Sequence, residues 1–405
     1  MYSLRIIFFI IPLYFSHILS PIGMTIWESY SFERQKVYLF LFLFLIAYIE
    51  WLIRFPWRIL DILRKYGAIF ALLLIIPIIS TLYFSGYLDM YWLLGSHEKH
   101  HGYLFYCGIL SLILLLMSSP REHLRKYISW SMASAILVAL IAIWERLGGV
   151  FDIYGRSEML SMYPGRSSST LGNPNYVAGY LLPFIPLLVA NIRRVQSQIQ
   201  GRIDMQIANM VMLGILLVGI GVTGSHIAIL LIGLLALWYL IIYILRGYDT
   251  WKQILIFSLF SVFGIFLLFS WFDPAKLLSL ESRFVLMAEA LSMMVTQPLS
   301  LLIWFGPESL LTHFSEARST LVNTYFPSTM LIDSSHSIII DSLFQYGILP
   351  VWLCVSLLFR KRRSFGSPLW ISTILLLVFL AFNVLVISHM MILILIIIEF
   401  GRYQK

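Results

Sequence analysis

A short stretch late in the chain concentrates side chains that could transfer a proton. In IDSSHSIIIDSLFQYG, residues 332–347, Asp333 and His336 precede an apolar run and Asp341 lies inside it. A neutral imidazole can accept a proton at ordinary pH, because its unperturbed pKa is about 6.5. Asp333 or Ser335 could equally cap the following helix, whereas an acid inside an apolar run usually faces a partner or a wet cavity. The segment therefore predicts either a general base or a helix cap at His336.

Three other polar segments contain residues that could bind an anion. Arg166 precedes the turn GNPN, and Asn173 and Asn175 flank the proline of that turn, where a helix would begin with free amides. Arg283, in ESRF, has a guanidinium group that binds phosphate oxygens in bidentate fashion. His226 ends the turn TGSH. The alternatives are a polar turn near Arg166, a lipid-headgroup contact at Arg283 and a plain helical hairpin at His226.

These candidates belong to a chain with the composition of a polytopic membrane protein. Hydrophobic residues make up 60% of the 405 residues, charged residues make up 12%, and the mean hydropathy is +0.87. A membrane core about 30 Å thick needs roughly 20 apolar residues per helix, so we expect an all-α fold with about twelve transmembrane helices. The apolar runs lie near residues 4–26, 37–53, 68–84, 102–118, 128–146, 175–191, 207–222, 226–245, 253–270, 337–358, 368–386 and 388–400.

Positive charges are sorted between alternate connections of these runs. Most of the 28 lysines and arginines fall on the side of the two termini, among them Arg64, Lys126 and Arg362. Positive residues concentrate on the cytoplasmic side of membrane proteins. We therefore expect both termini in the cytoplasm and the candidate residues outside. Topology then accounts for the net charge of +8, and no nucleic-acid partner is expected.

Two long connections are predicted on the outer side, over residues 147–174 and 271–336. No internal repeat divides the chain, so residues 1–405 are expected to form a single integral membrane domain. Cys107 and Cys354 fall inside apolar runs, where a thiol behaves as a small hydrophobe. They predict neither a disulfide nor a metal site, and no cofactor is expected.

The second outer loop has the pattern of two short amphipathic helices. Ser282 can cap the first, which would stop before Pro298, and Pro307 can open the second. On the second helix an apolar face is predicted from the spacing of Leu310, Phe314, Ala317 and Leu321. Lying along the membrane surface, the two helices would form a lid.

Taken together, these segments resemble the O-antigen ligase and O-antigen polymerase superfamily of bacterial membrane glycosyltransferases. The resemblance rests on the number of apolar runs and on the segments GSHEKHHGYLFY, RSSSTLGNPNYVAGYL, the TGS turn, ESRF with QPLSLLIWFGPES, and IDSSHSIIIDSLFQYGILP; the ligase-like region covers about residues 165–355. It implies a metal-independent, inverting transferase in the bacterial cytoplasmic (inner) membrane. Such an enzyme moves a glycan from an undecaprenyl-diphosphate carrier to a hydroxyl of an acceptor on the outer face.

The resemblance also implies roles for individual residues. His336 would be the general base, and Arg283, Arg166 and His226 would hold the donor diphosphate. The supporting positions would be Asp333, Asp341, Asn173 and Asn175. The chain departs from the family pattern at His226, where an arginine is common, at Ser337, where an asparagine is common, and at Trp304, where a glycine is frequent.

Several functions stay open at this stage. Ligase, polymerase and protein-glycosylating transferases share this machinery and differ in acceptor, which would be a glycan, a lipid or a protein. A lipid-linked oligosaccharide flippase or another secondary transporter is the alternative from a different class, although such proteins usually show paired half-repeats. A catalytically inactive member of the same family is the third reading, prompted by His226 and Ser337.

Overall fold

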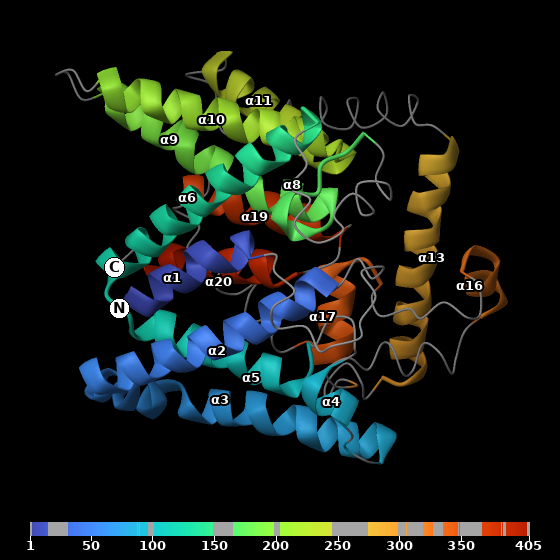
Figure 1. The fold of residues 1–405 in the computed structure, drawn as a ribbon. Coiled ribbons are helices and arrows are strands. Elements are labelled where there is room, and N and C mark those ends of the chain that lie inside the picture. Colours follow the sequence, from blue (N-terminus) through green and yellow to red (C-terminus); the bar gives the residue numbers. More distant parts are fainter. Residues whose placement is uncertain are drawn as a thin grey trace.

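The computed structural model of the protein is a set of packed helices (Figure 1). It describes residues 2–14, 31–86, 88, 90–95, 101–148, 165–197, 203–244, 274–298, 305, 319–326, 335–346, 348, 367–381, 383 and 386–402. Within these ranges all regular elements are helical and no strand occurs, which confirms the predicted all-α class. The elements are α1 (Tyr2–Leu13), α2 (Ser31–Arg54), α3 (Pro56–Ser85), α4 (Met90–Leu94), α5 (Tyr103–Ser118), α6 (Arg121–Arg146), the 3-10 turn η2 (Ser169–Leu171), α8 (Pro174–Leu181), α9 (Phe184–Ser197), α10 (Ile203–Thr223), α11 (His226–Ile244), α13 (Pro274–Thr296), α16 (Thr320–Tyr325), α17 (Ile338–Tyr346), α19 (Pro368–Leu380) and α20 (Ile387–Arg402).

In the described part of the chain, five helical stretches are long and apolar enough to cross a membrane, judged by length and composition. They are Gln35–Arg54, Leu60–Phe84, Arg121–Arg146, Pro174–Arg194 and Ile203–Thr223. Shorter apolar helices include α1, α5 and parts of α11, α19 and α20. These helices fit a membrane protein, as predicted. The predicted span at 253–270 lies outside the described residues.

Some predicted boundaries are wrong because the helices continue past the apolar runs. The sequence predicted a basic connection between runs ending at 53 and starting at 68, yet Phe55 alone separates α2 from α3. Pro56 can begin α3 because proline lacks the N–H that a first helical residue leaves unpaired. Arg64 therefore lies on a helix. In the same way α6 begins at Arg121, ahead of its apolar run.

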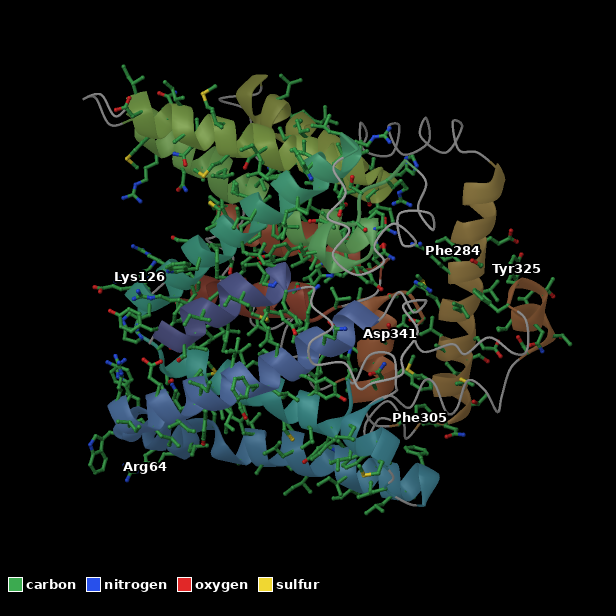
Figure 2. All side chains as sticks on the ribbon, viewed as in Figure 1. Arg64, Lys126, Phe284, Phe305, Tyr325 and Asp341 are labelled. Atoms are coloured by element: carbon green, nitrogen blue, oxygen red, sulfur yellow. The ribbon has the colours of Figure 1, made fainter. Side chains whose placement is uncertain are left out.

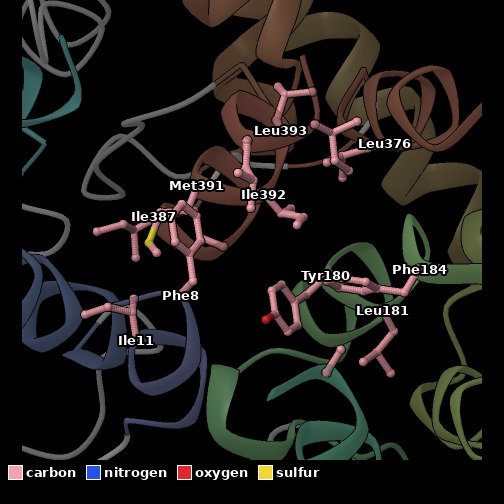
Figure 3. Close-up of a cluster of buried hydrophobic side chains, with 14 of the residues drawn as sticks. Phe8, Ile11, Tyr180, Leu181, Phe184, Leu376, Ile387, Met391, Ile392 and Leu393 are labelled. Atoms are coloured by element: carbon pink, nitrogen blue, oxygen red, sulfur yellow. The ribbon is translucent and has the colours of Figure 1, made fainter. Parts of the chain in front are cut away.

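One apolar core joins helices from both halves of the chain. Phe8 and Ile11 of α1 lie near Met391 of α20, and Tyr180 of α8 belongs to the same cluster (Figure 3). The helix α6 packs against both α1 and α10. At Gly219 of α10, an added Cβ would lie only 2.7 Å from the Cβ of Ala139 on α6. Small residues allow such close helix contacts, which are a frequent means of helix association in lipid.

A proline inside α3 is compensated by α5. Proline has no N–H to donate and displaces the carbonyl one turn before it, so Pro77 leaves backbone oxygens of α3 in need of donors. The Tyr106 hydroxyl donates to the Leu73 carbonyl at 3.0 Å, and the Tyr103 hydroxyl donates to the Leu74 carbonyl at 2.8 Å. These two hydrogen bonds supply donors to the backbone carbonyls that precede Pro77, and they join α3 to α5.

The bundle has two ends that differ in the residues they present. The chain termini lie near one another at the left of Figure 1, and Arg64 and Lys126 lie at this end in Figure 2. Asp341 and Phe305 lie toward the opposite end, where α17 and α13 are found. Arg64 and Lys126, which belong to the basic segments predicted on the side of the termini, therefore lie at the end of the bundle away from the candidate acid Asp341.

The helix α13 runs across this opposite end, at a steep angle to α2, α3 and α5 (Figure 1). Its predicted start at Ser282 is wrong, because the helix begins about two turns earlier, at Pro274. Proline suits the first turn of a helix, and the alanine, lysine and leucines that follow it favour helix. The predicted stop before Pro298 is confirmed, since α13 ends at Thr296.

The helix α13 buries one apolar face, but its exposed side also carries the apolar residues Phe284, Leu291 and Val295, so the predicted amphipathic pattern is only partly present. Leu286, Ala290 and Met294 recur every four residues and are buried together with Val322 of α16 and Phe344 of α17. This second cluster attaches α13 to α17 at the end of the bundle.

The second predicted lid helix is described only at its end. Ser319 is extended and caps α16 by accepting a hydrogen bond from the Val322 amide, so a helix from Pro307 does not run unbroken to residue 322. Leu321, predicted on the apolar face, is 56% exposed, and Val322 is buried instead. The Glu289 carboxylate accepts a hydrogen bond from the Ser319 amide at 2.9 Å and ties α16 to α13. Leu310, Phe314 and Ala317 lie outside the described residues.

Candidate functional site

The predicted turn and helix start at GNPN are present. Asn173 is extended and precedes α8, and its side chain accepts a hydrogen bond from the Asn175 amide at 2.9 Å. Pro174 occupies the first helical position, which suits its fixed φ and missing N–H. Asn173 is therefore a helix cap. The Asn175 side chain, on the first turn of α8, is the contact between this helix and Arg166.

Arg166 is held by both polar turns that the sequence singled out. Its Nη2 donates to Asn175 Oδ1 at 3.1 Å, and its Nε donates to the Thr223 carbonyl at 2.8 Å. Gly224 of the TGS turn has a φ of 60° and lies against Arg166, since a Cβ added to it would be 3.4 Å from Arg166 Cγ and Nε. The structure thus brings the TGS turn next to Arg166 and GNPN, from which it is distant in sequence.

His226 follows this turn as the first residue of α11 and is exposed. It shares the turn that holds Arg166 through Thr223 and Gly224.

Arg283 lies on α13 within electrostatic range of Arg166. Burial lowers the pKa of the Arg283 guanidinium, the positive charge of Arg166 lowers it further, and Tyr176 of α8 opposes these two effects. The two guanidinium groups therefore lie within electrostatic range of one another near α8. Such a pair repels itself and favours an anion, because a bound negative charge relieves the repulsion.

His336 has a backbone conformation that is rare for a residue with a side chain. Its φ is 60°, in the left-handed region, and Ser335 and Ser337 on either side are buried. The Asp341 carboxylate accepts a hydrogen bond from the Ser335 amide at 2.7 Å, while the Asp341 amide donates to the Ser337 carbonyl at 2.8 Å. The Ser337 amide donates to Ser335 Oγ at 3.3 Å. Asp341 thus hydrogen-bonds the backbone on both sides of His336.

The geometry joins some predicted residues directly and others only through helices. Arg166, Asn175 and the TGS turn contact one another, and Arg283 interacts with Arg166 through charge. His336 is linked to Arg283 by the packing of α13 on α17. Phe305 strengthens this junction, since its amide donates to the Phe344 carbonyl at 3.1 Å and its ring stacks on Phe344. Asp333 lies outside the described residues.

Several supporting residues were missed by the sequence analysis. Buried Glu145 accepts hydrogen bonds from the amides of Ser168 and Ser169, and Lys36 donates to the Thr170 carbonyl at 2.7 Å. Their only sequence signal is a charge at the end of an apolar run, which is also where charges at a membrane surface stand.

His389 of α20 was missed for a different reason. It is fully buried, and its Nε2 lies 2.8 Å from the Tyr176 carbonyl. Since a carbonyl only accepts hydrogen bonds, Nε2 is the donor. This bond fixes the first turn of α8, and it joins segments more than two hundred residues apart, which no local sequence pattern reveals.

The described residues contain no group of three or more His, Cys, Asp or Glu side chains that could hold a metal ion. Comparison of the chain with protein-family models, with curated proteins and with solved structures gave no match.

Proposed function

We propose that the protein is a membrane glycosyltransferase of the O-antigen ligase or polymerase type. It would transfer a glycan from an undecaprenyl-diphosphate donor to an acceptor hydroxyl at the outer face of the bacterial cytoplasmic membrane. The observation that carries the proposal is the electrostatic interaction of Arg166 with Arg283, with Arg166 bonded to Asn175 at the start of α8. A diphosphate carries negative charges on neighbouring phosphates, and two guanidinium groups suit it.

In this mechanism one residue acts on the acceptor hydroxyl and two residues act on the leaving diphosphate. His336, neutral, takes the proton of the acceptor hydroxyl, and the acceptor oxygen attacks the anomeric carbon. The bond from that carbon to the diphosphate oxygen breaks, and its electron pair leaves with undecaprenyl diphosphate. Arg166 and Arg283 offset the negative charge that grows on the departing diphosphate. Attack opposite the leaving group inverts the configuration at the anomeric carbon.

The strain at His336 supports its part in this scheme. Left-handed backbone at a residue other than glycine costs on the order of 1 kcal/mol or more and is most frequent at functional sites. A residue that served only to lead into α17 would be better as glycine or asparagine. The buried serines and Asp341 hold His336 in this conformation.

The proposal is tested by assaying the purified protein in lipid nanodiscs with an undecaprenyl-diphosphate-linked glycan and candidate acceptors. Wild type should release undecaprenyl diphosphate as glycan is transferred. Arg283→Ala should lose nearly all transfer and Arg283→Lys much of it, since an ammonium does not replace the guanidinium fork. Lys126→Ala, at the other end of the bundle, is the control. Equal transfer by Arg283→Ala and wild type would remove Arg283 from the site.

The alternative of a flippase or transporter predicts a different outcome. Such a protein would move the lipid-linked glycan between leaflets without breaking the bond to diphosphate. Scrambling of a labelled donor in vesicles, with no release of undecaprenyl diphosphate under any acceptor, would favour transport. An inactive family member would bind the donor and neither cleave nor move it.

A further inference from the structure

The segment that follows Arg166 is held by four different helices. The Ser167 amide donates to the Val222 carbonyl of α10 at 3.1 Å. Ser169 Oγ donates to the Val138 carbonyl of α6, Thr170 Oγ1 donates to the Pro12 carbonyl of α1, and Lys36 of α2 donates to the Thr170 carbonyl. Residues 167–170 are all buried. This short stretch is therefore built into the bundle and does not behave as a surface loop.

Glu145, near the end of α6, makes the contacts that define the shape of this stretch. A single carboxylate oxygen, Oε2, accepts hydrogen bonds from the Ser168 amide at 3.1 Å and the Ser169 amide at 2.8 Å. Ser169 has a φ of 46°, which is unfavourable for serine. A conformation of this kind persists where its surroundings fix it, and the charged acceptor supplies bonds that are stronger than those to a neutral oxygen.

We propose that Glu145 is a positioning residue for Arg166, a role that rests on the function proposed above. Arg166 directly precedes residues 167–170. The hydrogen bond from the Ser167 amide to the Val222 carbonyl places Arg166 beside Thr223, and the Thr223 carbonyl accepts a hydrogen bond from Arg166 Nε. Without the carboxylate, two buried amides lose their acceptor and Ser169 can relax from its left-handed conformation. The Arg166 guanidinium then loses its fixed approach to Asn175 and to the donor diphosphate.

A buried acid at this place is otherwise difficult to explain. Glu145 is only 8% exposed and stands at the end of the apolar part of the helical stretch Arg121–Arg146. Burying a carboxylate in such surroundings is unfavourable unless its oxygens are hydrogen-bonded. The amides of Ser168 and Ser169 donate these hydrogen bonds, so Glu145 and residues 167–170 stabilise one another.

The test compares Glu145→Ala and Glu145→Gln with wild type in nanodiscs. Glu145→Gln keeps an acceptor oxygen, while Glu145→Ala keeps none. Leu124→Ala, which opens a cavity in the distant end of the same helix, controls for loss of packing alone. Amide hydrogen exchange of a peptide covering residues 166–172 and binding of undecaprenyl diphosphate are measured for each variant.

Glu145→Ala should speed exchange in this peptide by about tenfold or more and weaken diphosphate binding by about tenfold, because a charged acceptor for two buried amides is lost. Glu145→Gln should retain most of both properties, and Leu124→Ala should leave both near wild type. Unchanged exchange in Glu145→Ala would overturn the inference. Faster exchange with unchanged binding would overturn it as well, because Glu145 would then hold the turn without positioning Arg166.

A different result would show that the proposed function itself is wrong. If wild type and Arg166→Ala bind undecaprenyl diphosphate equally poorly, the donor assignment is wrong. The exchange result still decides whether Glu145 holds the stretch that carries Arg166.

Discussion

At the scale of single residues, His336 joins an unfavourable backbone conformation to a side chain suited to proton transfer. A φ of 60° is accessible to glycine without a steric penalty. His336→Gly should therefore unfold at a temperature equal to or above that of wild type while losing transfer, whereas His336→Val should be less stable than either. Thermal unfolding followed by intrinsic fluorescence measures the order. A lower unfolding temperature for His336→Gly than for His336→Val would contradict the strained conformation.

The charge state of Arg283 has a defined consequence for stability. Burial and Arg166 lower its pKa in the folded protein, so the folded state binds this proton less tightly than the unfolded state. The shift opposes folding wherever the pH is below the folded pKa, and this penalty is lost as the pH rises from the folded pKa to the higher unfolded pKa. At neutral pH the penalty is present in full, and an anion bound as proposed above would offset it.

The contacts of individual residues were predictable where both partners lie within one short segment of the sequence. The helix start at Asn173 and Asn175 and the acid Asp341 belong to short segments that the sequence singled out, and each of these side chains makes a hydrogen bond in the structure. Glu145 and His389 were not predictable, since their partners lie on other helices. The approach of Arg283 to Arg166 was expected only from the family resemblance, because nothing in the spacing of the two arginines requires it.

At the scale of elements, the break in α3 depends on donors from α5. Removing the Tyr106 hydroxyl leaves the Leu73 carbonyl next to Pro77 without this donor, and a buried carbonyl without a partner costs about 1–3 kcal/mol. Tyr106→Phe should lower the unfolding temperature by several degrees, and Tyr103→Phe with Tyr106→Phe should lower it further. Tyr83→Phe, at an exposed position of α3, is the matched control.

The result can be read directly from the order of the variants. If Tyr106→Phe and Tyr83→Phe unfold at the same temperature, the two hydroxyls do not compensate the proline.

Helix existence was predictable from the apolar runs, but such helix ends as Pro56, Arg121 and Pro274 were not. Charged residues extend these helices, and hydropathy gives no signal for a helix that continues beyond its apolar part.

At the scale of the whole molecule, the two ends of the bundle should face opposite sides of the membrane. Lys126 lies at the end of the termini, and Thr320 is exposed on α16, which packs on α13 at the other end (Figures 1 and 2). In a background with Cys107 and Cys354 replaced by serine, Thr320→Cys should react with a membrane-impermeant thiol reagent in spheroplasts, and Lys126→Cys should react only after lysis. Labelling of Lys126→Cys alone before lysis would reverse the orientation.

In the proposed function, the arginines bind the donor diphosphate and His336 takes the proton, so the two tasks belong to different residues. The most direct test measures undecaprenyl-diphosphate binding and glycan transfer on the same His336→Ala preparation, with Arg283→Ala beside it. A positioned base contributes about 10²- to 10⁴-fold in rate, so His336→Ala should bind the diphosphate within a few-fold of wild type and show no detectable transfer, whereas Arg283→Ala should lose both. Transfer by His336→Ala at a rate near that of wild type would contradict the account.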